Sequence, residues 1–520
     1  MKSSTAPLPL ASAPWAVAAI LAGAVLLRCV GVTSRWLWLD ELLTVNWSVH
    51  GPWAAIVNTV RFDLHPPLYY LQIGLWALPS HDDVWLMTNT ILWSSAAVGL
   101  LIYAASQVYG LRVGLYSGLL LALAPAALAY SDQVRMYSFL VFLIIWVWYA
   151  QERWLSETAG RFGAFWMILS QTSIIYTHGT GLVMLSGCVL YGAVRALTTG
   201  RGQTVLRWFA IECVVGVAAL PAVVFALMHR AAHTHSPDWR EIVQTWSFLT
   251  FGDMGSACAD ISPADNCTSL LAFGDTGPAW MLALAALLFA ALLVLAIYDK
   301  RTRLPLATLV LTPLILAAII SQFKTMWLPR VFVPIVPFIC LILAVGVAAS
   351  DKQSGVRTGL RTSAFMLLAV VWAGMGMFQQ FTRQKGDGFK PAAELVRTMV
   401  RPGDIVLVDD NYHYWCFNWY YLGSNWGDPR HAFLPDAEWA RLLMRLPVSI
   451  TTLLDLNDSD SSLSSGGATV ELWNRIRIPP ESTADLIVVR EQATRQPNFP
   501  NRHLASATPV KQLLVERWTQ

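Results

Sequence analysis

Long apolar runs recur along most of this chain and limit what it can fold into. They begin at residue 14 and stop near residue 380, and examples are 14–34, 208–228, 280–298 and 362–380. A helix needs about 20 such residues to cross the hydrocarbon core of a bilayer. Only 13% of the residues are charged, whereas soluble domains carry roughly 25%. The sequence therefore predicts a polytopic α-helical membrane protein.

The chain changes character after residue 381. Charged residues, Pro, Ser and Asn return from Thr382 to Gln520, and no run in this part is long enough to span a membrane. We therefore expect two domains. A transmembrane domain occupies 1–381 and includes a long loop at 35–83, and a water-soluble domain occupies 382–520.

The second domain has the pattern of a small α/β domain. PAAELVRTMV indicates a helix, and a turn at 401–404 separates it from the strand-like IVLV. Apolar stretches at 447–454 and 485–490 are candidates for further strands. Asp409 and Asp410 follow the first strand, and we interpret them as ordinary surface acids.

Positive charges in the short loops predict the orientation. Arg and Lys gather in alternate loops, namely Arg112; Arg153 and Arg161; Arg195, Arg201 and Arg207; Lys300, Arg301 and Arg303; and Lys352, Arg357 and Arg361. Cytoplasmic loops carry such an excess, so we expect these loops inside. The other loops and the C-terminal domain are then extracytoplasmic, and roughly eleven helices span the inner (plasma) membrane.

One apolar stretch does not fit this alternation. PPLYYLQIGLWALP, from Pro66 to Pro79, is bounded by prolines and has only 14 residues. That length favours an interfacial or re-entrant helix over a span. If this stretch crossed the membrane, every later loop would change sides and the basic loops would face outward, against the charge bias.

Charge and cysteine usage exclude some classes of ligand. The net charge is +3, and the basic residues lie in short loops instead of a stripe, so we expect no nucleic-acid partner. The seven cysteines form no CxxC pair, and the acids show no clustered set of metal ligands. We therefore expect no metal and no other cofactor. Cys258 and Cys267 share one polar segment, and a disulfide between them is left open.

Two adjacent acids, Asp40 and Glu41, follow the first apolar run and are flanked by Trp and Leu residues. Such a setting would partly desolvate them, and burial raises the pKa and the basicity of a carboxylate. A base that abstracts a proton needs this kind of tuning. The alternative is that the pair caps a helix, because acids favour helix N-termini. From these residues alone both interpretations stay open.

Polar residues also lie where two later helices begin, in loops that we expect to be extracytoplasmic. His65 precedes two prolines and could bind or protonate an oxygen, or it could simply begin a helix that has Pro in its first turn. Arg135 and Tyr137 lie at the mouth of the next helix. The fork of an Arg side chain binds two phosphate oxygens at once. An Arg that anchors the helix beside lipid headgroups is the alternative.

Further cations are expected at the same membrane depth, and these are Arg28, His178, Lys324 and Arg330. Charges in such positions are costly, so they indicate function, especially when one anion is their shared partner. Together with the two acids, these groups would supply a base for a hydroxyl group and a cationic clamp for a phosphate leaving group.

Taken in order, these segments resemble the membrane-embedded C-type glycosyltransferases. The likeness is to the family 39-like group of protein O-mannosyltransferases and bacterial lipid A aminoarabinose transferases, and it covers residues 14–421. Its carriers are Arg28, LWLDELLT, HPPLYYL, SDQVRMYSF, YTHGTG, LPRVFVPIVP and the segment 389–421. Two motifs depart from the family pattern. MTNTILWSSA at 87–96 has no Arg, and Val331 follows Arg330 where the family has Tyr.

The resemblance implies an inverting hexosyl- or pentosyltransferase that takes its sugar from a polyprenyl-phosphate donor. The acceptor would be a hydroxyl group of a glycolipid, polysaccharide or protein in the cell envelope. By the same resemblance Asp40 is the base and Glu41 supports it. The donor phosphate would be bound by His65, Arg135, Tyr137 and Arg330, with Arg28 a weaker candidate and His178 and Lys324 further members of the pocket.

A multi-span transporter or flippase for a lipid or glycan is the main alternative, because it would also have many spans and polar groups near one face. The sequence shows no internal repeat of broken helices, which is typical of many transporters. It also has no GxGxxG unit for a nucleotide donor, and a lipid carrier would bring the sugar through the bilayer instead. A purely structural membrane assembly factor is a third possibility.

Overall fold

The computed structural model describes most of the chain, and its contacts divide the chain into two compact units. The described residues are 13–63, 65–228, 237–252, 279–323, 327–348, 355–382, 386–401, 405–408, 411–421, 423–424, 449–452, 485–492 and 502–519. The first unit comprises 1–32, 64–69 and 87–383, and the second comprises 33–63, 70–86 and 384–520. Most of the loop at 35–83 thus groups with the C-terminal residues. The domain division at residue 381 stays a prediction.

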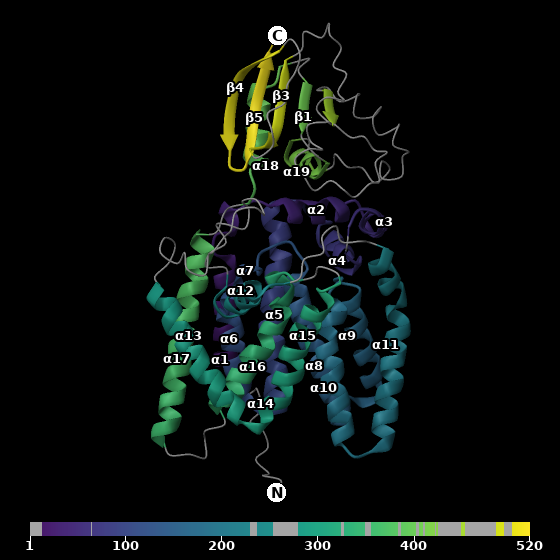
Figure 1. The fold of residues 1–520 in the computed structure, drawn as a ribbon, viewed down its shortest axis with the longest axis vertical. Helices are drawn as coiled ribbons and strands as arrows, with labels where there is room; N and C mark the ends of the chain where they lie inside the picture. The colour runs from purple at the N-terminus through teal and green to yellow at the C-terminus, as the bar shows by residue number, and fades with distance from the viewer. Residues whose placement is uncertain are drawn as a thin grey trace. The chain divides into compact units, whose positions relative to one another are not determined.

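The first unit is helical (Figure 1). Its longer elements are α1 (Pro14–Cys29), most of α5 (Asp83–Tyr109), α6 (Leu111–Leu123), α8 (Tyr137–Leu155), α9 (Gly163–Ile175), α10 (Gly181–Thr198), α11 (Gly202–Met228), α12 (Trp239–Phe251), α13 (Ala279–Tyr298), α15 (Thr312–Ile320), α16 (Val336–Ala348) and α17 (Gly355–Thr382). Shorter elements are η2 (Val32–Ser34), α7 (Pro125–Ala129), η3 (Gly160–Phe162), α14 (Lys300–Pro305), η5 (Leu306–Leu311) and η6 (Pro329–Ile335).

Seven of the described helical stretches are long and apolar enough to cross a membrane. They are Pro14–Ser34, Asp83–Tyr109, Gly181–Thr198, Gly202–Phe225, Lys300–Ile320, Pro329–Ala348 and Gly359–Phe381. Shorter apolar helices at Leu111–Leu123 and Ala283–Tyr298 accompany them. The predicted polytopic helical architecture is confirmed, and the count of eleven spans stays a prediction.

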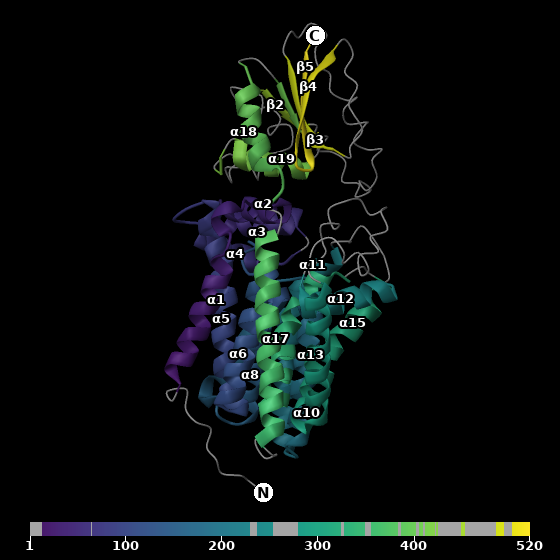
Figure 2. The ribbon, with the colours of Figure 1, turned by 90° about the vertical axis from the view of Figure 1, so that its left-hand side faces the viewer.

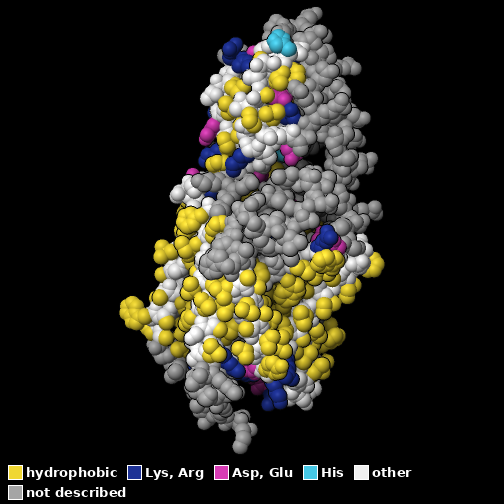
Figure 3. All heavy atoms as spheres, turned by 60° about the vertical axis from the view of Figure 1, so that its left-hand side comes forward, with side chains coloured by type: hydrophobic (Ala, Val, Ile, Leu, Met, Phe, Trp, Pro, Cys, Tyr) yellow, Lys and Arg dark blue, Asp and Glu magenta, His cyan; other side chains and the backbone are white. Residues whose placement is uncertain are grey.

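The outer face of this helical unit is apolar. Leu206, Val217, Val294 and Val370 are each more than half exposed. Figure 3 shows hydrophobic side chains gathered over the helices, with Lys and Arg side chains at one end of the apolar surface. Soluble monomers rarely expose continuous apolar surface of this extent, whereas lipid chains cover it in a bilayer. The chain is therefore a multi-pass membrane protein.

Helix α16 lies at the centre of the first unit. Every residue from Val336 to Val347 is buried, as expected for a helix that is apolar on all sides. It packs against α6, which in turn approaches α5 closely. A Cβ atom at Gly118 would lie 2.1 Å from Ile102 Cγ1, and one at Gly114 would lie 1.9 Å from Ser106 Oγ. Small residues four apart on one face allow such close packing.

The second unit combines short helices with a small α/β domain. The helices are α2 (Leu39–Ser48), α3 (Pro52–Phe62) and most of α4 (Leu68–Trp76). The α/β domain contains α18 (Phe389–Met399), β1 (Ile405–Val408), α19 (Asn411–Tyr421), β2 (Ser449–Thr452), β3 (Leu486–Glu491), β4 (His503–Val510) and β5 (Leu513–Thr519). The predicted αβ unit and both further strands are confirmed. Helix α4 has only nine residues, so it is too short to span a membrane, as predicted.

The five strands form one mixed sheet in the order β2-β1-β3-β5-β4. Strand β1 runs parallel to β2 and β3, and β5 runs antiparallel to both β3 and β4. Helix α18 packs against β5, and α19 packs against β1. Figure 2 shows both helices beside the sheet. The central strand β3 is buried except at its last residue, and its first four residues form an apolar run, as expected for a strand that is covered on both faces. Cys258, Cys267, Asp409 and Asp410 lie outside the described residues.

Candidate active site

The two predicted acids form the first turn of α2 in the second unit, and we call Asp40 and Glu41 the acidic turn. Trp38 is extended and the helix begins at Leu39. Glu41 is fully buried, and its Oε2 accepts hydrogen bonds from Arg35 Nη2 at 2.6 Å and from the N–H of Trp38 at 3.1 Å. Glu41 is therefore the acid that caps the helix, and Arg35 balances its charge.

Asp40 has a different environment from Glu41. Its side chain is half-buried instead of fully buried, and its main-chain carbonyl accepts a hydrogen bond from Thr44 Oγ1 at 2.8 Å. Neighbouring residues of a helix point about 100° apart, so the two carboxylates leave the helix in different directions. The capping interpretation thus holds for Glu41, and the assignment of Asp40 as the base stays a prediction.

Side chains from the C-terminal residues contact the chain just before the acidic turn. Tyr420 Oη accepts a hydrogen bond from the N–H of Leu37 at 2.9 Å and donates one to Asp83 Oδ2 at 3.0 Å. Asp387 Oδ2 accepts a hydrogen bond from the N–H of Leu39 at 2.6 Å. Burial, and then the charge of Asp83, raises the pKa of Tyr420 well above its ordinary value. The phenol therefore keeps the proton that it donates.

The buried Arg35–Glu41 pair gives a testable stability effect. Glu41→Gln would remove the charge that pairs with the guanidinium of Arg35, which is 8% exposed. Breaking a buried ion pair in this way costs about 3 to 5 kcal/mol. We expect a clearly lower midpoint of thermal unfolding for the purified full-length protein, measured by differential scanning fluorimetry.

A matched control is Glu157→Gln, which breaks the exposed pair between Glu157 and Arg201. Their side chains are 71% and 67% exposed, and exposed pairs contribute about 0 to 1 kcal/mol. Equal unfolding midpoints for the Glu41 and Glu157 variants would contradict the structural role of the buried pair.

The first unit brings together three of the predicted site residues, His65, Tyr137 and His178, which we call the histidine cluster. The ring centroids of His65 and His178 are 4.4 Å apart, and those of Tyr137 and His178 are 6.0 Å apart. The N–H of Leu68 donates to the carbonyl of Tyr176 at 2.9 Å and so joins the start of α4 to the end of α9. Residues 176–180 form the turn between α9 and α10, and α8 begins at Tyr137, in agreement with the expected position of Tyr137 at the mouth of a helix.

Hydrogen bonds indicate which nitrogen of His178 is protonated. Nδ1 accepts a hydrogen bond from the N–H of Thr180 at 3.0 Å and lies 2.8 Å from Thr180 Oγ1. An amide N–H can only donate, so Nδ1 carries no proton and the neutral ring is protonated at Nε2. His178 is 5% exposed. The histidine cluster therefore presents an N–H donor in a largely buried setting.

The other predicted cations differ in placement. Arg135 is 7% exposed and lies in the turn before α8, two residues from Tyr137. Arg330 is the second residue of η6 and is half-buried. Lys324 lies outside the described residues. Arg135 thus adjoins the histidine cluster along the chain, whereas the roles of Arg330 and Lys324 stay predictions.

Arg28 is completely buried in the last turn of α1. Its Nε donates to Ser94 Oγ at 2.7 Å, and its Nη atoms donate to the carbonyls of Ala24, Ala122 and Leu121 at 3.0, 3.2 and 3.5 Å. These bonds join α1 to α5 and α6. They indicate that Arg28 stabilises helix packing, and they make it a poorer candidate for a ligand of the donor phosphate.

The segment 87–96 contains a buried amide that sequence reasoning did not single out. Asn89 is fully buried, and neither its nitrogen nor its oxygen has a hydrogen-bond partner among the described residues. Trp93, one turn further along α5, packs against Phe139 with ring centroids 4.6 Å apart. A buried amide in a membrane-spanning helix is the signal that marks this position.

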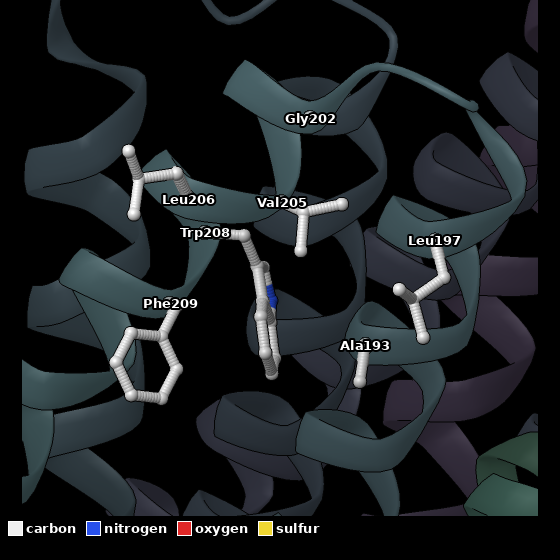
Figure 4. A pocket seen from close by; sticks show the side chains of 7 residues that line it. All are labelled: Ala193, Leu197, Gly202, Val205, Leu206, Trp208 and Phe209. Carbon is white, nitrogen blue, oxygen red and sulfur yellow. The ribbon is translucent and has the colours of Figure 1, made fainter.

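The described residues contain neither a cluster of metal-ligating side chains nor reactive groups in the groove between α10 and α11. No group of three or more His, Cys, Asp or Glu side chains is arranged there to hold a metal ion. An open groove of about 440 Å³ between α10 and α11 is lined by Ala193, Leu197, Gly202, Val205, Leu206, Trp208 and Phe209 (Figure 4). This lining has no carboxylate, imidazole or guanidinium, so we do not place the chemistry in this groove.

Comparisons with known proteins identify the fold. No protein-family model and no curated protein matches the sequence. The structure of ArnT from Cupriavidus metallidurans in the apo state matches with a TM-score of 0.57 and 14% identity, over 98% of this chain and 98% of that chain. The chain has the C-type glycosyltransferase fold. ArnT bound to undecaprenyl phosphate matches with a TM-score of 0.52 and 14% identity, over 97% and 98% of the two chains.

The C-type fold confirms the fold class and the resemblance expected from the sequence. It extends over the helical unit and the C-terminal α/β domain, because both chains are covered almost completely.

Proposed function

We propose that this protein is an inverting glycosyltransferase that moves a sugar from polyprenyl phosphate to a hydroxyl group of a cell-envelope acceptor. The observation that carries the proposal is the match to ArnT over 97% of this chain in a structure that holds undecaprenyl phosphate. A protein with this fold can bind a polyprenyl phosphate. The donor is then a sugar on the same kind of lipid carrier, and the acceptor is a lipid, glycan or protein.

Asp40 acts as the base in this proposal. The acceptor oxygen attacks the anomeric carbon, the bond from that carbon to the phosphate oxygen breaks, and the hydroxyl proton passes to Asp40. The half-buried position of Asp40 leaves it accessible, while the buried Glu41 caps the helix and fixes the turn. A single displacement of this kind inverts the anomeric centre.

The donor phosphate leaves as an anion, so it needs cations and hydrogen-bond donors. We assign this role to Arg135, His65, Tyr137 and Arg330, with His178 as a neighbouring donor. Support comes from the histidine cluster, whose rings lie 4.4 and 6.0 Å apart, and from the burial of Arg135, which strengthens its interaction with an anion. The fork of Arg135 can bind two phosphate oxygens.

The proposed location is the inner (plasma) membrane, with the acidic turn and the C-terminal domain outside the cytoplasm. The alternate basic loops support this orientation, because cytoplasmic loops carry the excess of Arg and Lys. The orientation can be tested with the variant Asp82→Cys, because Asp82 is exposed. We expect a membrane-impermeant thiol reagent to label this cysteine on whole cells. Labelling that requires disrupted cells would place this part of the chain in the cytoplasm and contradict the proposal.

The test of the proposed function is mass spectrometry of envelope lipids and polysaccharides from cells with and without the gene. We expect one glycosylated species to disappear without the gene and its unmodified acceptor to accumulate. The gene for Asp40→Asn should not restore the product. If the protein were a flippase, cells without the gene would instead accumulate the glycosylated lipid on the cytoplasmic side of the membrane. Identical glycan profiles with and without the gene would contradict sugar transfer.

The mechanism predicts that transfer needs no divalent metal ion. The roles assigned to Arg135 and the histidine cluster supply the charge that a metal would otherwise bring to the phosphate. We expect the initial rate of product formation in isolated membranes to persist in excess EDTA. A complete loss that Mg²⁺ or Mn²⁺ restores would show that a metal takes part.

A further inference from the structure

Three consecutive backbone amides before the acidic turn donate hydrogen bonds to side chains. The N–H of Leu37 donates to Tyr420 Oη, that of Trp38 to Glu41 Oε2, and that of Leu39 to Asp387 Oδ2. The first amides of a helix have no partner within the helix. Here two of the three acceptors belong to the C-terminal segment 384–520.

The hydroxyl group of Tyr420 also forms a second hydrogen bond, to Asp83. It donates to Asp83 Oδ2 at 3.0 Å while it accepts from Leu37 at 2.9 Å. Lys390 Nζ lies 3.6 Å from the same carboxylate oxygen of Asp83. The phenol oxygen therefore has a defined position, and the backbone at Leu37 is defined with it.

The segment around Asp387 fits closely against the chain that enters α2. The indole N–H of Trp36 donates to the main-chain carbonyl of Asp387, and Lys511 Nζ lies 4.5 Å from the centroid of the Trp36 ring. Gly386 has a φ of +76°, and a Cβ atom there would lie 2.4 Å from the carbonyl oxygen of Trp36. Only glycine fits this position without strain.

Contacts continue along α2 beyond its first turn. Asn46 Nδ2 donates to the carbonyl of Trp415 at 3.3 Å, and the rings of Trp47 and Trp415 meet edge to face with centroids 5.1 Å apart. Cys416 Sγ lies 3.8 Å from the carbonyl oxygen of Leu39. The C-terminal segment thus contacts α2 at both ends, and its hydrogen bonds concentrate at the end that carries the acids.

We infer that Tyr420 and Asp387 are positioning residues for Asp40, which fix the backbone of the acidic turn from the C-terminal α/β domain. This inference rests on the proposed function. It assigns to the domain a part in aligning the base with the acceptor hydroxyl group. Asp40 follows Leu39 directly, so a shift of the Leu39 amide moves the carboxylate by a comparable distance.

The expected effect on catalysis follows from the sensitivity of proton transfer to distance. A displacement of about 1 Å in a reacting group lowers a rate by about 100-fold. Loss of one of the two hydrogen bonds to the backbone amides of Leu37 and Leu39 should shift the acidic turn by less than about 1 Å. We therefore expect Tyr420→Phe and Asp387→Ala each to lower the rate of transfer by about 10- to 100-fold.

The experiment uses the purified full-length protein added to membranes from cells whose own gene is deleted, which supply donor and acceptor. The rate is followed by mass spectrometry of the product, and the affinity for undecaprenyl phosphate by a thermal-shift titration. Hydrogen–deuterium exchange of peptides that cover 35–41 reports the backbone bonds directly. Tyr421→Phe is the matched control, because that hydroxyl group has no hydrogen-bond partner among the described residues and the ring stacks on Phe417.

We expect faster exchange at 35–41, a lower rate and an unchanged affinity for undecaprenyl phosphate in Tyr420→Phe and Asp387→Ala. Asp387→Asn keeps an acceptor oxygen for the Leu39 amide, so it should recover most of the rate. Wild-type exchange in both variants would overturn the inference. Loss of undecaprenyl phosphate binding in either variant would also overturn it. The same holds if Asp387→Asn does not restore the rate of transfer, or if Tyr421→Phe lowers the rate as much as Tyr420→Phe does.

The exchange measurement separates this inference from the proposed function. If the wild-type protein forms no product, the assignment as a glycosyltransferase fails. Faster exchange at 35–41 in the two variants would then still support the restraint by the C-terminal domain, and unchanged exchange would overturn that restraint as well.

Discussion

Asp40→Asn should lower the rate of sugar transfer by about 100- to 10,000-fold, which is the usual contribution of a general base. The substitution keeps the size of the side chain but removes the group that accepts the hydroxyl proton. Product formation in membranes from gene-deleted cells measures the rate. The affinity for undecaprenyl phosphate should stay at the wild-type value, because the phosphate ligands are unchanged.

Asp82→Asn is the control for this variant. Asp82 is exposed, and its Oδ1 accepts a hydrogen bond from the N–H of Val84 at 2.9 Å. An amide oxygen at this position can accept the same bond, so we expect the wild-type rate. If Asp40→Asn retained the rate of Asp82→Asn, the acidic turn would not supply the base.

Arg135→Gln should weaken the binding of undecaprenyl phosphate by about 10- to 100-fold, because a hydrogen bond to a charged group is worth about 1.5 to 3 kcal/mol. Arg135 is 7% exposed and adjoins the histidine cluster, so water screens its interaction with a phosphate only weakly. The dissociation constant can be measured by a thermal-shift titration with the lipid in detergent micelles. Gln retains a polar group but removes the charge.

Arg112→Gln is the matched control for the phosphate ligand. Arg112 is half-buried at the start of α6, where Nε donates to Tyr116 Oη at 3.2 Å. It belongs to a basic loop that we expect on the cytoplasmic side. The same loss of affinity in both variants would indicate a general charge effect and would remove Arg135 from the site.

Much of the fold can be predicted from hydrophobic patterning, and the failures have physical reasons. The helix at 391–400 and the strand IVLV were predictable because an amphipathic pattern changes there into an apolar run. The hairpin of β4 and β5 was missed. Strand β4 is exposed along nearly its whole length and contains Pro509, while β5 contains a buried charge, Glu516, which pairs with Arg490 at 2.7 Å. Neither strand has the alternation that identifies a half-buried strand.

The candidate site was predictable only in part. The acidic turn and the histidine cluster contain residue types that stand out in an apolar sequence. Arg35 could have been identified, because it lies only six residues before the acid that it pairs with. Tyr420 and Asp387 could not, because they bind Leu37 and Leu39, at the start of α2, across 383 and 348 residues of sequence. Nothing in the local pattern of either residue distinguishes it from an ordinary surface Tyr or Asp.

The buried Arg28 has a consequence for how the protein is made. An Arg at the centre of an inserting helix costs about 2.5 to 3.5 kcal/mol, and the cost is smaller for Arg28, which lies in the last turn of α1. The partners of this guanidinium outside α1 lie far ahead in the chain, and they include Ser94 at 66 residues and Ala122 at 94 residues. When the ribosome first delivers α1 to the insertion machinery, neither partner has been synthesised. Arg28 in α1 therefore reaches these partners only after α6 has been synthesised.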